Sequence, residues 1–318
     1  MRYAITGATG FVGGVLARQL RAAGHEVVAL VRDPGRATAL TRAGVELVPG
    51  DLDDSAALDR ICAGADGLFH VAGWYKLGQR DPSVGDRVNV EGTRNALAAA
   101  QRAGVAKVVH TSTVAVNGDT HGRVYDETFR HTGAHLSDYD RTKAEAHAVA
   151  EQFATDGLPV VIVQPGLVYG PGDTAQTGAL LAQVVAGRRP QVPSGGGVCW
   201  AHVEDVAAGH LLAMEKGVPG ESYLLAGPRA TLAEGLTQAA AIAGTKPPMV
   251  LPTGLVRAVS ALAGGLGRVV PLPPDLAAET MRASLATYYG SSAKAERDLG
   301  WHARDLETGL RETVAALR

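Results

Sequence analysis

A tyrosine and a lysine four positions apart are the residues in this sequence best suited to proton transfer. Tyr139 and Lys143 fall in a segment with helical periodicity, so their side chains lie on one face, one turn apart. A phenol has an ordinary pKa of about 10, and a nearby ammonium favours the phenolate. Such a phenol exchanges a proton with a carbonyl or alcohol oxygen near neutral pH. Thr113 or Ser112, at the end of a predicted strand, is placed to hydrogen-bond the same oxygen.

The opening stretch, MRYAITGATGFVGGV, predicts a ligand-binding loop near Tyr139 and Lys143. A short apolar run leads into Gly7, Gly10 and Gly13, and then into a helical pattern. Strand, glycine turn and helix in this order bring backbone N–H groups and the positive end of a helix to a dinucleotide pyrophosphate. The spacing is GxxGxxG rather than GxGxxG, and its position in a strand–turn–helix unit predicts a cofactor loop. A bound nicotinamide cation would favour the Tyr139 phenolate further.

Arginines follow the second predicted strand. Glu26–Val31 reads EVVALV, without the alternation of a half-exposed strand, and Arg32 and Arg36 come next. In dinucleotide-binding folds an acidic residue at this place binds the ribose 2′-hydroxyl, whereas an arginine accommodates a 2′-phosphate. The sequence therefore predicts NADP as the cofactor. Asp33 stands one position late for the acidic role, which keeps NAD as an alternative.

Strands alternate with helical patterns through the first half of the chain. Further strands are predicted at Val45–Val48, Asp66–Ala72, Val105–Thr111 and Leu158–Val163. The helical patterns between them include Asp86–Gly104 and a helix capped by Ser137 or Asp138. This alternation predicts a Rossmann-type, doubly wound α/β fold with a parallel sheet.

The second half loses this alternation. Helical patterns there are separated by Pro/Gly loops, with Ser222–Leu225 as one returning strand. These helical patterns are Ala179–Ala186, Val203–Lys216, Leu232–Ala243, Leu255–Gly264, Ala277–Ala283, Ala293–Leu299 and Leu306–Leu317. We therefore expect an NADP-binding domain over residues 1–165, with a returning segment near 198–226, and a smaller, mostly helical substrate-binding domain over residues 166–318. The apolar character of residues 250–285 favours a modest, apolar ligand.

Composition excludes several classes of protein. The 318 residues carry 30 Lys and Arg against 32 Asp and Glu, a formal charge of −2, so we expect no nucleic-acid or membrane partner. Cys62 and Cys199 stand apart without metal-ligand spacing, which favours a reducing cytoplasm. The predicted strand at residue 3 leaves no room for a signal peptide. His131 and His135 are four apart in a loop without a carboxylate partner, so we predict no metal site.

Short motifs run along nearly the whole chain. They are TGATGFVG (Thr6–Gly13), GDL (Gly50–Leu52), HVAG (His70–Gly73), NVEGT (Asn89–Thr93), TSTVAV (Thr111–Val116), YDRTK (Tyr139–Lys143), QPGLVYGPGD (Gln164–Asp173), HVEDVA (His202–Ala207) and KAERDLGW (Lys294–Trp301). Together they resemble the extended short-chain dehydrogenase/reductases, also called the NAD-dependent epimerase/dehydratase family. LVRDP (Leu30–Pro34) and NVEGTRN resemble its dihydroflavonol-reductase-like branch.

The resemblance implies a catalytic set of Thr113, Tyr139 and Lys143, with Tyr139 as acid and base and Lys143 also holding the nicotinamide ribose. The cofactor contacts that we expect are Gly7, Thr9, Gly10, Phe11, Val12, Gly13, Arg32, Arg36, Asp51, Leu52, Val71, Ala72, Gly73, Asn89, Thr111, Ser112, Tyr139, Lys143, Pro165, Gly166 and Val168. Asp51 and Leu52 would flank the adenine, Val71–Gly73 the middle of the cofactor, and Pro165 and Val168 the nicotinamide.

Fewer residues support the expectations for the substrate and for partner chains. Trp74 and Tyr75 follow the fourth strand at its carboxyl end, the ligand side of an open sheet, so with Thr113 they are candidate substrate contacts. The resemblance also implies a homodimer through the helices Asp86–Ala103 and Tyr139–Thr155. The small-molecule substrate itself is not specified by these residues.

Two departures from the family patterns narrow the reaction. Val114 and Ala115 stand where sugar-nucleotide 4,6-dehydratases carry an Asp–Glu pair, which argues against dehydration. Val198 stands where nucleotide-sugar epimerases carry an arginine that clamps the diphosphate, although Arg188 and Arg189 offer a replacement. We therefore predict an NADP-dependent reductase or dehydrogenase for a carbonyl/secondary-alcohol pair. A nucleotide-sugar epimerase is the enzymatic alternative, and a cofactor-sensing regulator the non-enzymatic one.

Overall fold

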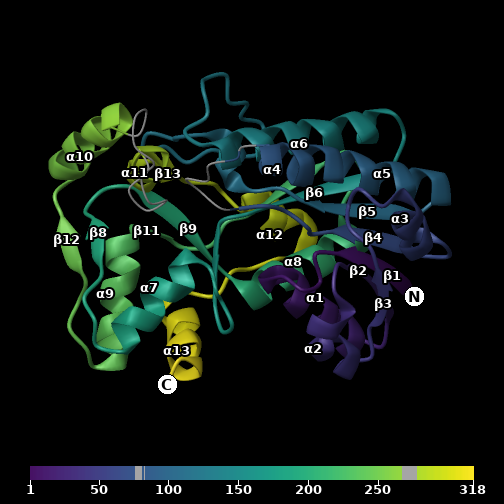
Figure 1. The fold of residues 1–318 in the computed structure, drawn as a ribbon, viewed down its shortest axis with the longest axis horizontal. Coiled ribbons are helices and arrows are strands. Elements are labelled where there is room, and N and C mark those ends of the chain that lie inside the picture. The colour runs from purple at the N-terminus through teal and green to yellow at the C-terminus, as the bar shows by residue number, and fades with distance from the viewer. Residues whose placement is uncertain (76–80, 82, 267–277) are drawn as a thin grey trace.

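The computed structural model describes residues 1–75, 81, 83–266 and 278–318, and within them seven strands form the main sheet (Figure 1). The strands are β1 (Arg2–Thr6), β2 (Glu26–Val31), β3 (Glu46–Pro49), β4 (Gly67–His70), β5 (Lys107–Thr111), β6 (Val160–Pro165) and β10 (Ser222–Leu225). Their order is β10-β6-β5-β4-β1-β2-β3, and neighbouring strands are parallel. The predicted Rossmann-type sheet is therefore confirmed, including Ser222–Leu225 as a returning strand.

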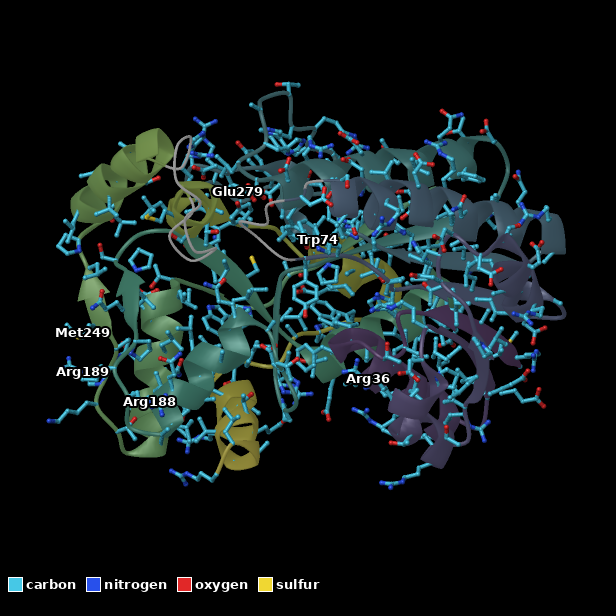
Figure 2. The ribbon with its side chains drawn as sticks, viewed as in Figure 1. Arg36, Trp74, Arg188, Arg189, Met249 and Glu279 are labelled. Atoms are coloured by element: carbon cyan, nitrogen blue, oxygen red, sulfur yellow. The ribbon has the colours of Figure 1, made fainter. Side chains whose placement is uncertain are left out.

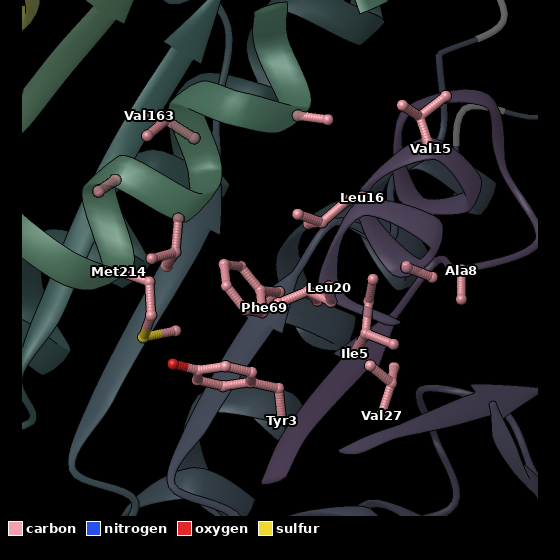
Figure 3. Close-up of a cluster of buried hydrophobic side chains, with 14 of the residues drawn as sticks. Tyr3, Ile5, Ala8, Val15, Leu16, Leu20, Val27, Phe69, Val163 and Met214 are labelled. Atoms are coloured by element: carbon pink, nitrogen blue, oxygen red, sulfur yellow. The ribbon is translucent and has the colours of Figure 1, made fainter. Parts of the chain in front are cut away.

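Helices cover both faces of this sheet because its strands are apolar on both sides. The helices are α1 (Phe11–Ala22), α2 (Thr38–Arg42) and α8 (Val203–Lys216) on one side, and α3 (Ser55–Cys62), α5 (Gly92–Ala103) and α6 (Asp138–Thr155) on the other (Figure 1). Figure 3 shows the first of these layers, where Leu16 of α1 and Met214 of α8 lie near Ile5 and Phe69 of the sheet. Each large apolar side chain buried there stabilises the fold by about 1.5–3 kcal/mol.

The strand order reverses between β1 and β4. In open parallel sheets a ligand binds outside the carboxyl ends of the strands at such a switch point. The Gly7–Gly13 loop follows β1 and the Val71–Trp74 segment follows β4, so both lie at this place.

Two small sheets stand beside the main one. Strands β11 (Arg229–Ala230), β9 (Gly197–His202) and β13 (Thr287–Tyr288) form one together with β7 (Leu167–Tyr169), and β8 (Gln191–Pro193) pairs with β12 (Met249–Leu251). The sequence predicted only Ser222–Leu225 as a strand in this half. The others were missed because runs of two to six residues show no distinguishable period.

The helices of this half agree closely with the predicted patterns. They are α7 (Gln176–Val185), α9 (Leu232–Ala243), α10 (Thr253–Leu266), α11 (Ala278–Leu285), α12 (Ala293–Leu299) and α13 (Leu306–Ala316). All of them except α12, which packs against α8 and β10 of the main sheet, lie with the small sheets at the left of the view in Figure 1. Within the described ranges, no helix combines the length and the apolarity that crossing a bilayer requires.

Candidate active site

The loop after β1 is shaped to admit a phosphate group. Gly7 has a φ of +76°, and a Cβ there would lie 2.5 Å from the Ala72 nitrogen, so only glycine fits. A Cβ on Gly13 would lie 2.2 Å from the Gly7 oxygen. Gly10 is the exposed N-cap of α1 and no side chain caps this helix, which leaves its first N–H groups available to an anion. The loop therefore fits a dinucleotide pyrophosphate, with Thr9, Phe11 and Val12 at its rim.

The arginines after β2 are free to bind a second phosphate. Arg32 and Arg36 are exposed, and their guanidinium groups form no hydrogen bond or ion pair with any residue that the structure describes. Figure 2 shows Arg36 beside α1 and α2. The Asp33 carboxylate instead accepts a hydrogen bond from the Gly35 nitrogen at 2.9 Å, capping the 3-10 turn Pro34–Arg36. Asp33, the acidic residue that could bind a ribose 2′-hydroxyl, therefore caps its own loop instead.

Lys143 is buried between α6 and the end of β5. Only 6% of the residue is exposed, and its Nζ atom donates a hydrogen bond to the Thr111 main-chain oxygen at 2.7 Å. Burial lowers the pKa of Lys143 to about 8. A Cβ built on Gly73 would lie 3.8 Å from Nζ, so the loop after β4 passes directly beside this ammonium group. Lys143 therefore lies at the switch point, next to the segment that faces the glycine loop.

Tyr139 is joined to Thr113 by a side-chain hydrogen bond. The sequence left Ser112 and Thr113 as alternative partners, and the structure places the Ser112 hydroxyl elsewhere, 2.8 Å from His147 Nδ1. Burial raises the pKa of Tyr139 to about 12, the Thr113 hydrogen bond opposes this rise and the Asp140 charge adds to it. The lowering of the pKa that was expected from Lys143 is not among these causes, and desolvation is the largest of them. At neutral pH this phenol keeps its proton.

Asn89 holds the loop that carries Trp74. It lies in the π-helical segment η2 (Asp86–Glu91), which follows α4 (Ser83–Gly85) and forms the start of the predicted helix Asp86–Gly104. Its Oδ1 accepts from the Trp74 nitrogen at 2.7 Å, and its Nδ2 donates to the Trp74 oxygen at 3.0 Å and to Thr142 Oγ1 at 2.9 Å. Asn89 was predicted as a cofactor contact, and these bonds assign its side chain to positioning the Gly73–Trp74 segment.

The remaining predicted contacts lie around the same crevice with different exposure. Leu52 is 7% exposed and packs in the core under α3 and α5, whereas Asp51 is exposed and accepts from the Leu52 nitrogen. Pro165 ends β6 and is buried, and Gly166 lies against β9, where a Cβ would meet the Cys199 oxygen at 2.2 Å. Val71, Ala72 and Val168 are partly exposed, as is Trp74, and Tyr75 is 58% exposed. The Thr111 hydroxyl bonds His210 Nε2 at 2.8 Å.

Asp140 is a buried acid next to Tyr139 that sequence reasoning missed. Its carboxylate accepts a hydrogen bond from Tyr288 of β13 at 3.2 Å, and burial raises its pKa to about 6. Ser137 caps α6 as predicted, accepting from the Asp140 nitrogen at 3.0 Å. The S-x-x-D spacing signals this cap. Nothing local in the sequence signals Tyr288, which is 148 residues away.

Neither arginine offered as a diphosphate clamp reaches the crevice. Arg188 and Arg189 are exposed at the end of α7, and Arg189 Nε donates to the Pro247 oxygen at 2.9 Å. Figure 2 shows both beside Met249 at the outer edge of the molecule, far from Trp74. The suggestion that they replace the missing arginine at Val198 is therefore wrong, because the loop after α7 turns away from the sheet.

The cluster closest to a metal site already contains a cation. His202, Glu204 and Glu312 bring potential ligand atoms within 4.8 Å of one another, the only such group among the residues described. The Arg304 guanidinium bonds Glu204 and Glu312, so it neutralises these acids itself. The His131 and His135 rings lie 4.9 Å apart and are outside this group.

Comparison with known proteins gives one family over most of the chain. The model of the NAD dependent epimerase/dehydratase family matches residues 3–226. A protein of Synechocystis sp. named "Putative dihydroflavonol 4-reductase" is 35% identical, the match covering 98% of this chain and 92% of that protein. "Sterol demethylase protein B" of Methylococcus capsulatus is 32% identical over 99% and 97% of the two chains.

A third relative and a solved structure agree. The 4-hydroxy-2-methyl-3-oxo-4-farnesyl-3,4-dihydroquinoline-1-oxide ketoreductase of Stigmatella aurantiaca is 33% identical over 96% of this chain and 92% of its own. The crystal structure of gox2253 superposes with a TM-score of 0.87 at 34% identity, covering 99% of this chain and 97% of that one. Similarity thus extends over nearly the full length, including residues 227–318, which lie beyond the family match.

Proposed function

This chain belongs to the NAD dependent epimerase/dehydratase family, and within it we propose an NADP-dependent carbonyl reductase or alcohol dehydrogenase, with Tyr139 as the proton donor and acceptor. The observation that carries the proposal is the set of contacts at the end of β5, where Thr113 bonds Tyr139 and the Thr111 oxygen holds Lys143. A nicotinamide bound beside Gly73 would supply or accept the hydride. Tyr139 then donates its proton to the carbonyl oxygen, while Thr113 orients the hydroxyl and Lys143 supplies positive charge.

The protonation state of the phenol favours the reducing direction. Burial raises the pKa of Tyr139 to about 12, so the hydroxyl holds the proton that a reduced carbonyl requires. The Asp140 charge acts in the same sense. Alcohol oxidation requires the phenolate, which Lys143 and an oxidised nicotinamide would have to stabilise against this burial.

NADP is the proposed cofactor because two arginine side chains, without partners in the described part of the chain, follow β2. The guanidinium groups of Arg32 and Arg36 have no partner among the described residues, and Asp33 is bonded to the Gly35 nitrogen. Two guanidinium groups suit a 2′-phosphate, since charge-assisted bonds to phosphate are about twice as strong as neutral ones.

We propose an uncharged, apolar carbonyl compound as the substrate. The negative charge of Glu279 on α11 acts on Asp140, the neighbour of Tyr139, so two acids lie near the phenol. Val198 stands at the position where an arginine would bind a diphosphate. Val256 and Met281 form an apolar cluster with Leu251 and Leu285 on α10, α11 and β12. Residues 267–277 of the apolar stretch lie outside the described structure. Two of the relatives are named for a sterol and a farnesylated quinoline, which supports the same class.

The test is a turnover assay on the purified protein. NADPH is mixed with a panel of cyclic and steroid ketones or, separately, with nucleotide sugars, and the absorbance of reduced nicotinamide is followed. Ketones are expected to consume NADPH, and Tyr139→Phe to lower turnover at least about 100-fold, the lower range for a lost general acid, with NADPH affinity near that of the native protein. Unchanged turnover in Tyr139→Phe would refute the assignment. Conversion of a nucleotide sugar without net loss of NADPH would instead identify an epimerase.

We also propose a homodimer through α5 and α6. These helices run side by side on the outside of the sheet (Figure 1), where a second copy can extend them into a four-helix contact. Light scattering that gives the mass of one chain would contradict this.

A further inference from the structure

Four side chains of α6 follow one another at four-residue intervals and form one stripe along the helix: Tyr139, Lys143, His147 and Glu151. Residues 111–113 at the end of β5 contact the first three of these side chains. Thr113 bonds Tyr139, the Thr111 oxygen accepts from Lys143, and the Ser112 hydroxyl lies 2.8 Å from His147 Nδ1. The strand end and the helix are thus joined by three consecutive contacts, of which the first two belong to the proposed catalytic set.

The surroundings of His147 determine which nitrogen carries its proton. The Ser112 hydroxyl and the Gln164 amide nitrogen both point at Nδ1, at 2.8 and 3.3 Å. The Glu151 carboxylate can only accept, and it lies 3.4 Å from Nε2, so it favours the tautomer in which Nε2 carries the ring proton and Nδ1 accepts. Glu151 accepts from His147, and His147 accepts from Ser112.

Apart from the partly exposed Glu151, the members of this chain of contacts are buried where they cannot exchange partners with water. His147 is 8% exposed, and Ser112 and Gln164 are each 4% exposed. Loss of one partner would leave a buried polar group unsatisfied, and this costs about 1–3 kcal/mol. Movement of Ser112 would also displace its neighbours Thr111 and Thr113, which hold Lys143 and Tyr139.

We propose that His147 is a positioning residue of the active site. Through Ser112 it fixes the strand end from which the Thr111 oxygen and the Thr113 hydroxyl hold the catalytic pair, and Glu151 keeps it in the tautomer that does so. The proposal rests on the proposed roles of Tyr139 and Lys143. It assigns to this chain a residue that acts on the reaction through Ser112, without touching substrate or cofactor.

The proposal is tested with His147→Ala, His147→Asn and Glu151→Gln, and with Glu145→Gln as the control, since Glu145 is an exposed acid of the same helix paired with Arg141. Asparagine offers an oxygen near the Nδ1 position that does not titrate. His147→Ala is expected to lower kcat for the most active ketone of the panel by about tenfold, with Kd for NADPH and cooperative unfolding retained. His147→Asn recovers much of this loss. Glu151→Gln, whose amide oxygen can still accept from Nε2, lowers kcat less than His147→Ala does, and Glu145→Gln leaves kcat at the native value.

A second measurement does not depend on the substrate. Imidazole nitrogen NMR of the NADPH-bound protein should show His147 as the Nε2–H tautomer near neutral pH. An Nδ1–H tautomer, a kcat of His147→Ala within about twofold of the native value, or a kcat of His147→Asn no higher than that of His147→Ala would each overturn the proposal. If Tyr139→Phe is inactive while His147→Ala is fully active, only the positioning role fails. If Tyr139→Phe retains turnover, the proposed function itself fails.

Discussion

The Nζ atom of Lys143 lies 2.7 Å from the main-chain oxygen of Thr111, in a place where only 6% of the lysine is exposed. This hydrogen bond holds the ammonium group at the switch point, and burial lowers its pKa from 10.5 to about 8. A pKa lowered to this extent corresponds to about 3 kcal/mol of unfavourable burial while the group is charged. Lys143 thus reduces the stability of the fold at neutral pH, as expected for a residue retained for its chemistry.

Replacement of Lys143 by methionine should therefore stabilise the protein and inactivate it. Below pH 8 the lysine is charged in both the folded and the unfolded chain, so its full burial cost is present. Methionine fills similar space without charge, and after loss of the bond to Thr111 we expect a gain of about 1–2 kcal/mol at neutral pH. Between pH 8 and 10.5 the native protein regains stability because its folded lysine is neutral, so this gain should shrink. Urea unfolding of the native protein and the variant, near neutral pH and in the alkaline range, measures the gain in stability and its decrease with pH. A variant less stable than the native protein at neutral pH would contradict this account of Lys143.

The glycine loop offers a test that separates cofactor binding from folding. Gly10 has φ −84° and ψ 176°, which alanine adopts readily, and a Cβ there would approach only the Gly7 oxygen among the described residues, at 3.2 Å. Gly10→Ala should leave the unfolding free energy within about 1 kcal/mol of the native value and weaken NADPH binding at least about tenfold, because the methyl group occupies the phosphate position. Gly13→Ala places its Cβ 2.2 Å from the Gly7 oxygen and should cost about 1–3 kcal/mol. Fluorescence titration with NADPH and thermal unfolding distinguish the two, and equal NADPH affinity in Gly10→Ala would place the pyrophosphate elsewhere.

The sequence was sufficient for the features that depend on neighbouring residues. The bounds Val203–Lys216 and Leu232–Ala243 were predicted to the residue, because strong periodicity and a polar N-cap define those helices. Contacts between distant residues were not predictable. His147 meets Ser112 from 35 positions away, and nothing in the helical pattern of α6 specifies which strand end it faces. The raised pKa of Tyr139 was missed for the same reason, since burial is set by the whole fold.

The arginines after β2 should decide between the two nicotinamide cofactors. Arg32→Ala and Arg36→Ala should each weaken NADPH binding about tenfold, because each removes one charge-assisted contact to the 2′-phosphate. Both variants should bind NADH as the native protein does, since NADH has no 2′-phosphate. Arg42→Ala is the matched control, because Arg42 is also exposed and lies on the neighbouring helix α2. The measurement is the Kd of each cofactor by nicotinamide fluorescence. If the native protein binds NADH more tightly than NADPH, the assignment of NADP is wrong.

A buried histidine behind the active site should make the fold sensitive to acid. His210 of α8 is fully buried, with Nδ1 2.7 Å from the Val206 oxygen and Nε2 2.8 Å from Thr111 Oγ1. Burial lowers the pKa of His210 to about 4, from 6.5. Between these values the unfolded chain binds a proton that the folded chain does not, so stability falls as the pH is lowered from 6.5 toward 4. This one group should account for about 2 kcal/mol of the loss by about pH 5.

His210→Gln tests the acid sensitivity, because glutamine keeps polar atoms at the site and does not titrate. The variant should be less stable near neutral pH, where it loses good hydrogen bonds, and should lose about 2 kcal/mol less than the native protein on acidification to about pH 5. Buried His70, whose pKa falls to about 3, acts in the same direction and remains in both proteins, so the variant keeps part of the dependence. His302→Gln, at an exposed position, should follow the native curve. Urea unfolding across this pH range supplies the comparison, and parallel curves for the native protein and His210→Gln would mean that His210 is not the group that titrates.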